Sequence, residues 1–74
     1  MNTERLIIMA NQIGDFFCSH PDAGQAKTDI ANHLKRFWAL SMRKQIVAHV
    51  HEKHGVGLDP IVGDAIKENQ SILI

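Results

Sequence analysis

The chain has 74 residues, of which 45% are hydrophobic and 22% are charged, and this balance is typical of a folded globular domain and excludes a disordered chain. Eight Lys and Arg residues match eight Asp and Glu residues, so the formal net charge is zero. This argues against nucleic acid as the main partner, because phosphate contacts dominate that affinity. The one cysteine, Cys18, excludes an internal disulfide and a cysteine-based metal cluster.

The small size of the chain limits its stability. A chain this short hides only about 60% of the surface that its unfolded form exposes. We therefore expect residues 1–74 to form one small domain that is stabilised by another protein or by a second copy of itself. No apolar run approaches the roughly 20 residues of a membrane span, and Met1 to Arg5 do not resemble a secretory signal. We expect a cytoplasmic protein with no membrane partner.

Apolar residues recur at three- and four-residue steps along most of the chain, which predicts helices. The first helix is expected to have Thr3 as its cap and to stop around Cys18 to His20, before Pro21. Its apolar face consists of Leu6, Met9, Ala10, Ile13, Phe16 and Phe17, and of these Met9, Phe16 and Phe17 are expected to be core residues.

A second helix is expected to begin after Asp22, with Gln25 in the position of a capping box. No proline or glycine interrupts the chain from there to His54, but the direction of the apolar residues changes. At about 100° per residue, those between 30 and 37 share one direction, and those between 42 and 50 point roughly 140° away. We therefore expect a break near Ala39 to Ser41, with Ser41 as the cap of a third helix that runs towards His54.

Glycines and a proline mark the last predicted boundaries. Gly55 and Gly57 are expected to end the third helix, one of them in the left-handed conformation. Asp59 followed by Pro60 predicts the start of a fourth helix, and the apolar tail at residues 72–74 is expected to pack on this chain or on another. No segment alternates with a period of two, so we predict an all-α fold, a small bundle of three to four short helices.

Two groups of residues suggest a metal site and a catalytic nucleophile, but neither group has the geometry that such a site requires. His49 and His51 lie about 200° apart around a helix, so they and His54 cannot converge on one metal ion, and histidines facing solvent at a helix end are the preferred interpretation. Cys18 precedes a serine and a histidine, but adjacency in sequence is not the arrangement of a nucleophile and its base. We expect a buried or half-buried structural cysteine, and no catalytic, cofactor-binding or metal-binding residue.

The segment from His33 to Lys44 differs in composition from the rest, because it holds the only tryptophan, a phenylalanine and a methionine between two basic pairs. Trp and Arg are the residue types that most often anchor protein interfaces. Trp38 is equally compatible with a place in the core. The predicted partner-binding residues are His33, Arg36, Phe37, Trp38, Met42 and Arg43.

A series of short motifs covers nearly the whole chain, from Leu6 to about Ala65. In order they are MANQIG at 9–14, FF at 16–17, Pro21, IANHL at 30–34, RFW at 36–38, MR at 42–43, His49, GL at 57–58, Pro60 and Val62. Their order and spacing resemble the small delta subunit of the soluble, cytoplasmic NAD-dependent formate dehydrogenases. That family often has an acidic residue and a proline after the tryptophan and an arginine before the methionine, where this chain has ALS at 39–41.

The resemblance implies a noncatalytic accessory role. In that family, formate is oxidised to carbon dioxide at a molybdenum pterin centre of the large subunit, and electrons pass through iron–sulfur clusters and flavin to NAD. The resemblance therefore implies that this chain binds the large (molybdenum) subunit, supports assembly or stability of the complex, and carries no cofactor itself.

Two alternatives remain open. Lys35, Arg36, Arg43 and Lys44 surround the predicted helical corner, as in a small helical nucleic-acid-binding protein, although Gln45 is the only amide on the third helix that would be ready to read a base edge. The other alternative is a self-dimerising regulatory protein, whose apolar face would be covered by a second copy. A homo-oligomer of the isolated chain would not by itself exclude the accessory role.

Overall fold

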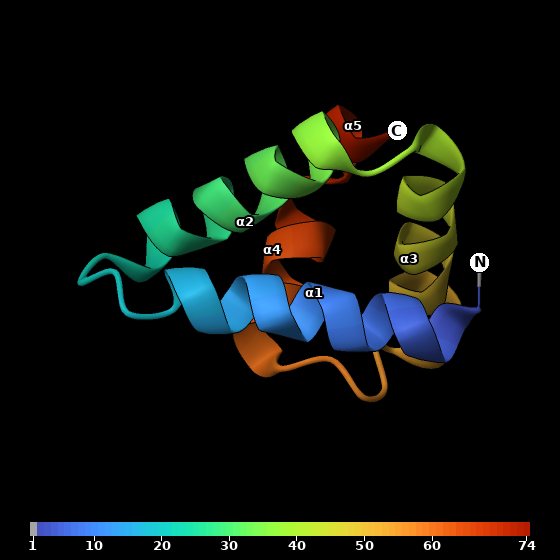
Figure 1. The fold of residues 1–74 in the computed structure, drawn as a ribbon, viewed down its shortest axis with the longest axis horizontal. Helices are drawn as coiled ribbons and strands as arrows, with labels where there is room; N and C mark the ends of the chain where they lie inside the picture. The colour runs from blue at the N-terminus through green and yellow to red at the C-terminus, as the bar shows by residue number, and fades with distance from the viewer. Residues whose placement is uncertain (1) are drawn as a thin grey trace.

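The computed structural model describes residues 2–74, which form five helices joined by short loops (Figure 1). The helices are α1 (Thr3–Phe17), α2 (Ala23–Phe37), α3 (Leu40–Lys53), α4 (Pro60–Glu68) and α5 (Gln70–Leu73). Residues 2–74 contain no strand, so the predicted small all-α bundle is confirmed. No helix in this part of the chain combines the length and the apolar character needed to cross a bilayer.

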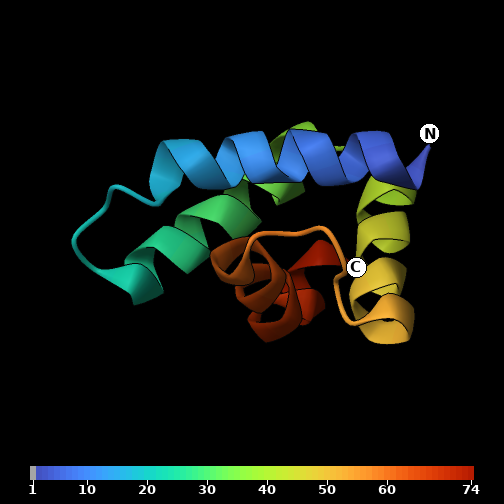
Figure 2. The same ribbon diagram turned by 90° about the horizontal axis from the view of Figure 1, so that it is seen from below.

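The helices pack around α4. Figure 1 shows α1 and α2 running back along each other from the loop at residues 18–22, with α4 behind them and α3 at the end away from that loop. In the view of Figure 2, α4 and α5 lie together beside α1 and α2. The most extensive contact joins α2 to α4, and α5 touches α2, α3 and α4. An ion pair of 2.8 Å between the Lys27 Nζ and a Glu68 carboxylate oxygen also links α2 to α4.

The core receives apolar side chains from all five helices and from the α2–α3 corner. Its members are Leu6, Ala10, Leu34, Trp38, Ile46, Val47, Val62, Ile66 and Leu73. Leu73 is fully buried, so the apolar tail packs on this chain, while Ile72 and Ile74 beside it are exposed. Met9 is half-buried and packs against this core, which confirms its predicted core position in part. Phe16 is 68% exposed, so its predicted core position is wrong.

The caps of α1 and α2 are side chains of Asn2 and Asp22. The Asn2 side chain accepts a hydrogen bond of 2.7 Å from the Glu4 N–H, so the cap is Asn2 and not Thr3. Asn2 is as good a capping residue type as Thr3. It caps the helix, which therefore begins at Thr3. The Asp22 carboxylate accepts from two backbone N–H groups of the first turn of α2, which confirms the predicted cap.

The break between α2 and α3 falls at Trp38 and Ala39, close to the predicted position. Both residues have extended backbone, with ψ values of 140° and 152°. Ala39 occupies the cap position of α3 without a side-chain hydrogen bond, so the prediction of Ser41 as the cap is wrong. The turn directs the Trp38 ring into the core, where it is 6% exposed. Burial of this large ring, instead of a capping side chain, holds the corner.

The loop between α3 and α4 is fastened to α1. It has positive φ at His54, Gly55 and Gly57, so the predicted left-handed glycine is confirmed and a histidine shares the conformation. The side chain of Asn11 on α1 donates to the Gly57 carbonyl at 2.9 Å and accepts from the Asp59 N–H at 2.8 Å. These two hydrogen bonds hold the start of α4 against α1.

A glycine allows α1 and α4 to approach each other closely. Gly14 is buried, and a Cβ atom built on it would overlap Cγ2 of Val62, which is itself fully buried. Valine is stiff about its first side-chain torsion, so it cannot easily move away. The α1–α4 contact therefore requires the absence of a side chain at residue 14.

The substitution Gly14→Ala is expected to lower the free energy of unfolding by about 1–3 kcal/mol, because overpacking outweighs the better helix propensity of alanine. Urea unfolding followed by circular dichroism measures the change. Gly63→Ala is the matched control, because no atom lies within 4 Å of a Cβ built there, and it should stabilise α4 by about 0.5–1 kcal/mol. A Gly14→Ala midpoint equal to or above that of the unmodified chain would contradict the close contact.

Candidate functional site

Most of the aromatic side chains lie outside the core. The chain has three phenylalanines and one tryptophan, and only Trp38 is buried. Phe16 is 68% exposed, Phe37 is 67% exposed and Phe17 is half-buried. Water-exposed phenylalanines gathered on one face mark an interaction surface more often than they mark a monomer's ordinary surface.

The three phenylalanines are joined by His33 into one ladder of rings. The Phe16 and Phe17 centroids are 5.0 Å apart, Phe17 meets the edge of His33 at 6.0 Å, and His33 lies 4.6 Å from Phe37. The last turn of α1 supplies two of these residues and the second half of α2 supplies the other two. We call Phe16, Phe17, His33 and Phe37 the aromatic edge.

Two shallow hollows follow the aromatic edge. One of about 280 Å³ is lined by Ile13, Phe16, Phe17 and His33 together with Gln12. The other, of about 270 Å³, continues from Phe17 and His33 to Phe37 and the polar side chains of α2. Phe17 and His33 line both hollows, so together they form a groove between α1 and α2 that an apolar side chain of a partner can enter.

The groove has a positive charge at one end. The Arg36 guanidinium carbon lies 5.7 Å from the centroid of the Phe37 ring, within the range of a cation–π contact. Lys35 and Arg36 occupy the last turn of α2, where the helix dipole favours cations. Asp29, which lines the same hollow, accepts a hydrogen bond of 2.9 Å from the Gln25 amide.

The six predicted partner-binding residues do not form one surface. His33 is half-buried, while Arg36 and Phe37 are exposed, and all three lie at the groove. Trp38 lies in the core, so its core alternative is the one that the structure shows. The aromatic edge, to which His33 and Phe37 belong, also contains Phe16 and Phe17, which the sequence pattern assigned to the core.

Met42 and Arg43 serve the interior of the bundle. Met42 is half-buried against the core. Arg43 is half-buried, and its Nη1 donates to the Leu73 carbonyl at 3.1 Å, which ties α3 to the end of α5. Gln45, the amide considered for reading bases, is half-buried and donates to the Thr3 hydroxyl at 2.7 Å.

The histidines of α3 make separate contacts. His49 Nε2 lies 2.7 Å from the Val56 carbonyl, and His51 is hydrogen-bonded to the Gln70 side chain. Within residues 2–74, no group of three or more His, Cys, Asp or Glu side chains is arranged to hold a metal ion. Cys18 is exposed, so the prediction of a buried or half-buried cysteine is wrong; α1 ends one residue before it.

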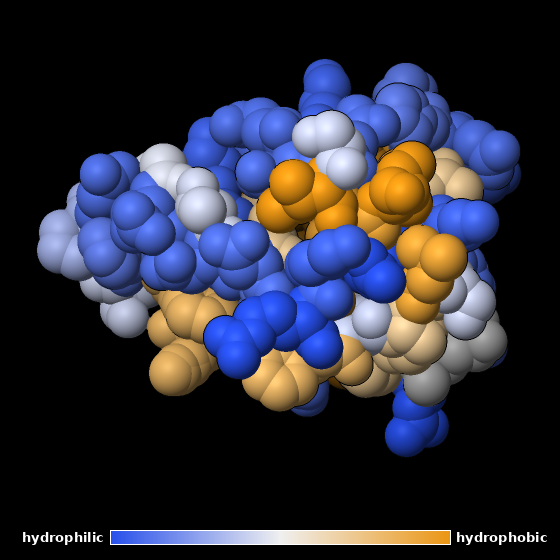
Figure 3. Space-filling model, turned by 90° about the horizontal axis from the view of Figure 1, so that it is seen from above, coloured by the Kyte–Doolittle hydropathy of each residue, from blue (hydrophilic) through white to orange (hydrophobic). Residues whose placement is uncertain are grey.

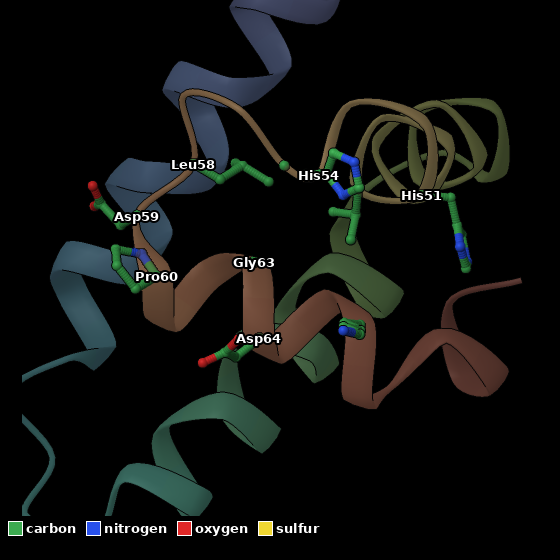
Figure 4. Close-up of a pocket in the computed structure, with 10 residues that line it drawn as sticks. His51, His54, Leu58, Asp59, Pro60, Gly63 and Asp64 are labelled. Carbon is green, nitrogen blue, oxygen red and sulfur yellow. The ribbon is translucent and has the colours of Figure 1, made fainter.

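A hollow of about 370 Å³ lies between the end of α3 and α4. Figure 4 shows Asp59 and Asp64 projecting away from His51 and His54, so the titratable groups that line it do not converge on a point. An acid–base pair or a metal site needs such convergence. The aromatic edge is therefore the candidate functional site.

An apolar groove on a small helical bundle, with an arginine at one end, is typical of a domain that binds another protein. Residues 5–66 match the family model described as the NADH-dependent formate dehydrogenase delta subunit FdsD. Because this match covers most of the 74 residues, the chain belongs to the family of formate dehydrogenase delta subunits. No curated protein and no solved structure matches the chain.

Substitution of two neighbouring aromatic residues is expected to change the free energy of unfolding by very different amounts. Trp38→Ala should lower the free energy of unfolding by about 3–5 kcal/mol, because it leaves a cavity in the core. Phe37→Ala should change it by less than about 0.5 kcal/mol, as is usual for an exposed position. Thermal and urea unfolding of both variants measure the difference. Equal losses at the two positions would show that Phe37 is part of the core.

Proposed function

We propose that this chain is a noncatalytic accessory subunit of a cytoplasmic NAD-dependent molybdenum formate dehydrogenase. It binds the large subunit through the aromatic edge and supports assembly or stability of the complex. The observation that carries the proposal is the ladder of Phe16, Phe17, His33 and Phe37, whose two end rings are exposed, on a chain of the delta-subunit family.

The exposed rings can supply the affinity. Full burial of a phenylalanine side chain is worth about 1.5–3 kcal/mol, and Phe16 and Phe37 are 68% and 67% exposed. Burying both against a partner therefore contributes roughly 2–4 kcal/mol before other contacts. A subunit that binds only the folded form of a partner stabilises that form by mass action. This is the physical basis of the accessory role.

The cofactors of the reaction belong to other subunits in this proposal. An iron–sulfur cluster needs several cysteine thiolates, and this chain has one cysteine. The candidate site consists of phenylalanine rings, a histidine that stacks between two of them and an arginine. Such a set does not fit a metal cluster, and we propose no catalytic or electron-transfer residue on this chain.

The double substitution Phe16→Ser and Phe37→Ser is expected to weaken binding to the purified large subunit by about 2 kcal/mol or more, roughly thirtyfold. Titration calorimetry, or co-purification with a tagged large subunit, measures the loss. Val56→Ser is the matched control, because this valine is 69% exposed but lies in the α3–α4 loop. Its binding should equal that of the unmodified chain, and circular dichroism should show the same helicity for all three proteins.

The accessory role has its own test. Formate dehydrogenase produced without this chain should be recovered with less assembled complex or with a lower unfolding temperature. If the large subunit folds, takes up its molybdenum pterin and remains fully active and stable without this chain, the proposed function is wrong. Tight, salt-dependent binding of the isolated chain to random duplex DNA would instead favour the nucleic-acid alternative.

A further inference from the structure

The positive strip beside the aromatic edge makes no ion pair within residues 2–74. Lys35 and Arg36 are both exposed in the last turn of α2. Within residues 2–74, neither side chain has a hydrogen bond or an ion pair, and the ion pair that is present joins Lys27 to Glu68. The helix end contributes about half a negative charge, which two full positive charges exceed. We call Lys35 and Arg36 the basic strip.

Arg36 of the basic strip lines the same hollow as Phe17, His33 and Phe37 of the aromatic edge. Figure 3 shows hydrophilic side chains, in blue, between a darker orange group and a paler orange group along the lower edge of the view. Leu40, Ile72 and Ile74 are also exposed apolar residues of this chain, at 45%, 38% and 61%. A partner that covers the aromatic edge therefore meets the basic strip next.

An interface of ordinary area that covers the aromatic edge must also cover the basic strip. A stable complex covers about 800 Å² on each partner, which is roughly a sixth of the 4530 Å² surface of this chain. Two or three phenylalanine rings cannot provide that area, because one ring buries about 150–250 Å² at most. The contact must extend from the aromatic edge over neighbouring side chains of α1 and α2.

Arg36 is prepared to bind a carboxylate. Its guanidinium lies 5.7 Å from the centroid of the Phe37 ring, and this contact restricts the side chain before any partner arrives. A guanidinium presents paired N–H donors that match the two oxygens of a carboxylate, and it loses less hydration than an ammonium group. Burying Arg36 in an interface without an anion would leave an unpaired charge, which is costly.

We infer that the partner surface facing α2 presents a carboxylate to Arg36, next to an apolar side chain that enters the groove between Phe17 and Phe37. This inference rests on the proposed function and specifies the chemistry of the bound surface. The partner is thus acidic where it meets the basic strip, and it is apolar where it meets the aromatic edge. Its acidic group selects the orientation in which the apolar side chain reaches the groove.

The test compares two charge reversals in formate dehydrogenase produced without this chain and then supplied with it. Arg36→Glu should weaken binding by about tenfold to a hundredfold, because it places two like charges together. Lys67→Glu is the matched control, since it reverses a charge in the last turn of α4 instead of α2 and should bind within twofold of the unmodified chain. Arg36→Lys should fall between Arg36→Glu and the unmodified chain, because it keeps the charge and loses the paired donors.

Salt dependence gives a second readout. Raising the ionic strength should weaken binding of the unmodified chain and of Lys67→Glu, and it should leave Arg36→Glu unchanged or slightly stronger. If Arg36→Glu binds within twofold of the unmodified chain, the inference is wrong while the proposed function stands. If the unmodified chain itself does not bind the complex, both are wrong.

Discussion

Burial of Trp38 at the α2–α3 corner is the interaction on which the arrangement of this small domain depends. The chain leaves α2 in extended conformation at Trp38 and Ala39, and the indole joins a core that also contains Leu34 and Ile46 from the two helices. The Trp38 side chain is 6% exposed, whereas the side chain of Phe37 directly before it is 67% exposed. The corner thus completes the core and leaves the last ring of the aromatic edge at the surface.

The motif at residues 9–14 fixes the other half of the molecule. Asn11 holds the loop before α4 through two hydrogen bonds, and Gly14 lets α4 pack directly against the α1 backbone. Because α4 also makes the most extensive contact with α2, these two residues join α1 to a helix on which α2 packs as well. They thereby support the packing of α1 beside α2, although neither lines the groove.

The sequence pattern was sufficient for the fold and insufficient for the site. The helical periods and the change of direction after Phe37 predict four helices and the corner, because both are local properties of the chain. Phe16 was assigned to the core because it follows Ile13 at a three-residue step. Successive steps of three and four residues do not return to the same direction around a helix. Gly14 and Phe16 are separated by about 200°, so once Gly14 is buried Phe16 must face away from α4. The bonds of Asn11 span 46 and 48 residues, and no local pattern reveals such partners.

The aromatic edge is composite, and this has a consequence for quality control in the cell. Phe16 and Phe17 come from one helix, His33 and Phe37 from the next, and the four rings meet only when α1 and α2 pack against each other. If the packing of these helices is lost, the four rings separate. A partner that contacts all four rings consequently binds the folded chain and does not bind a misfolded one.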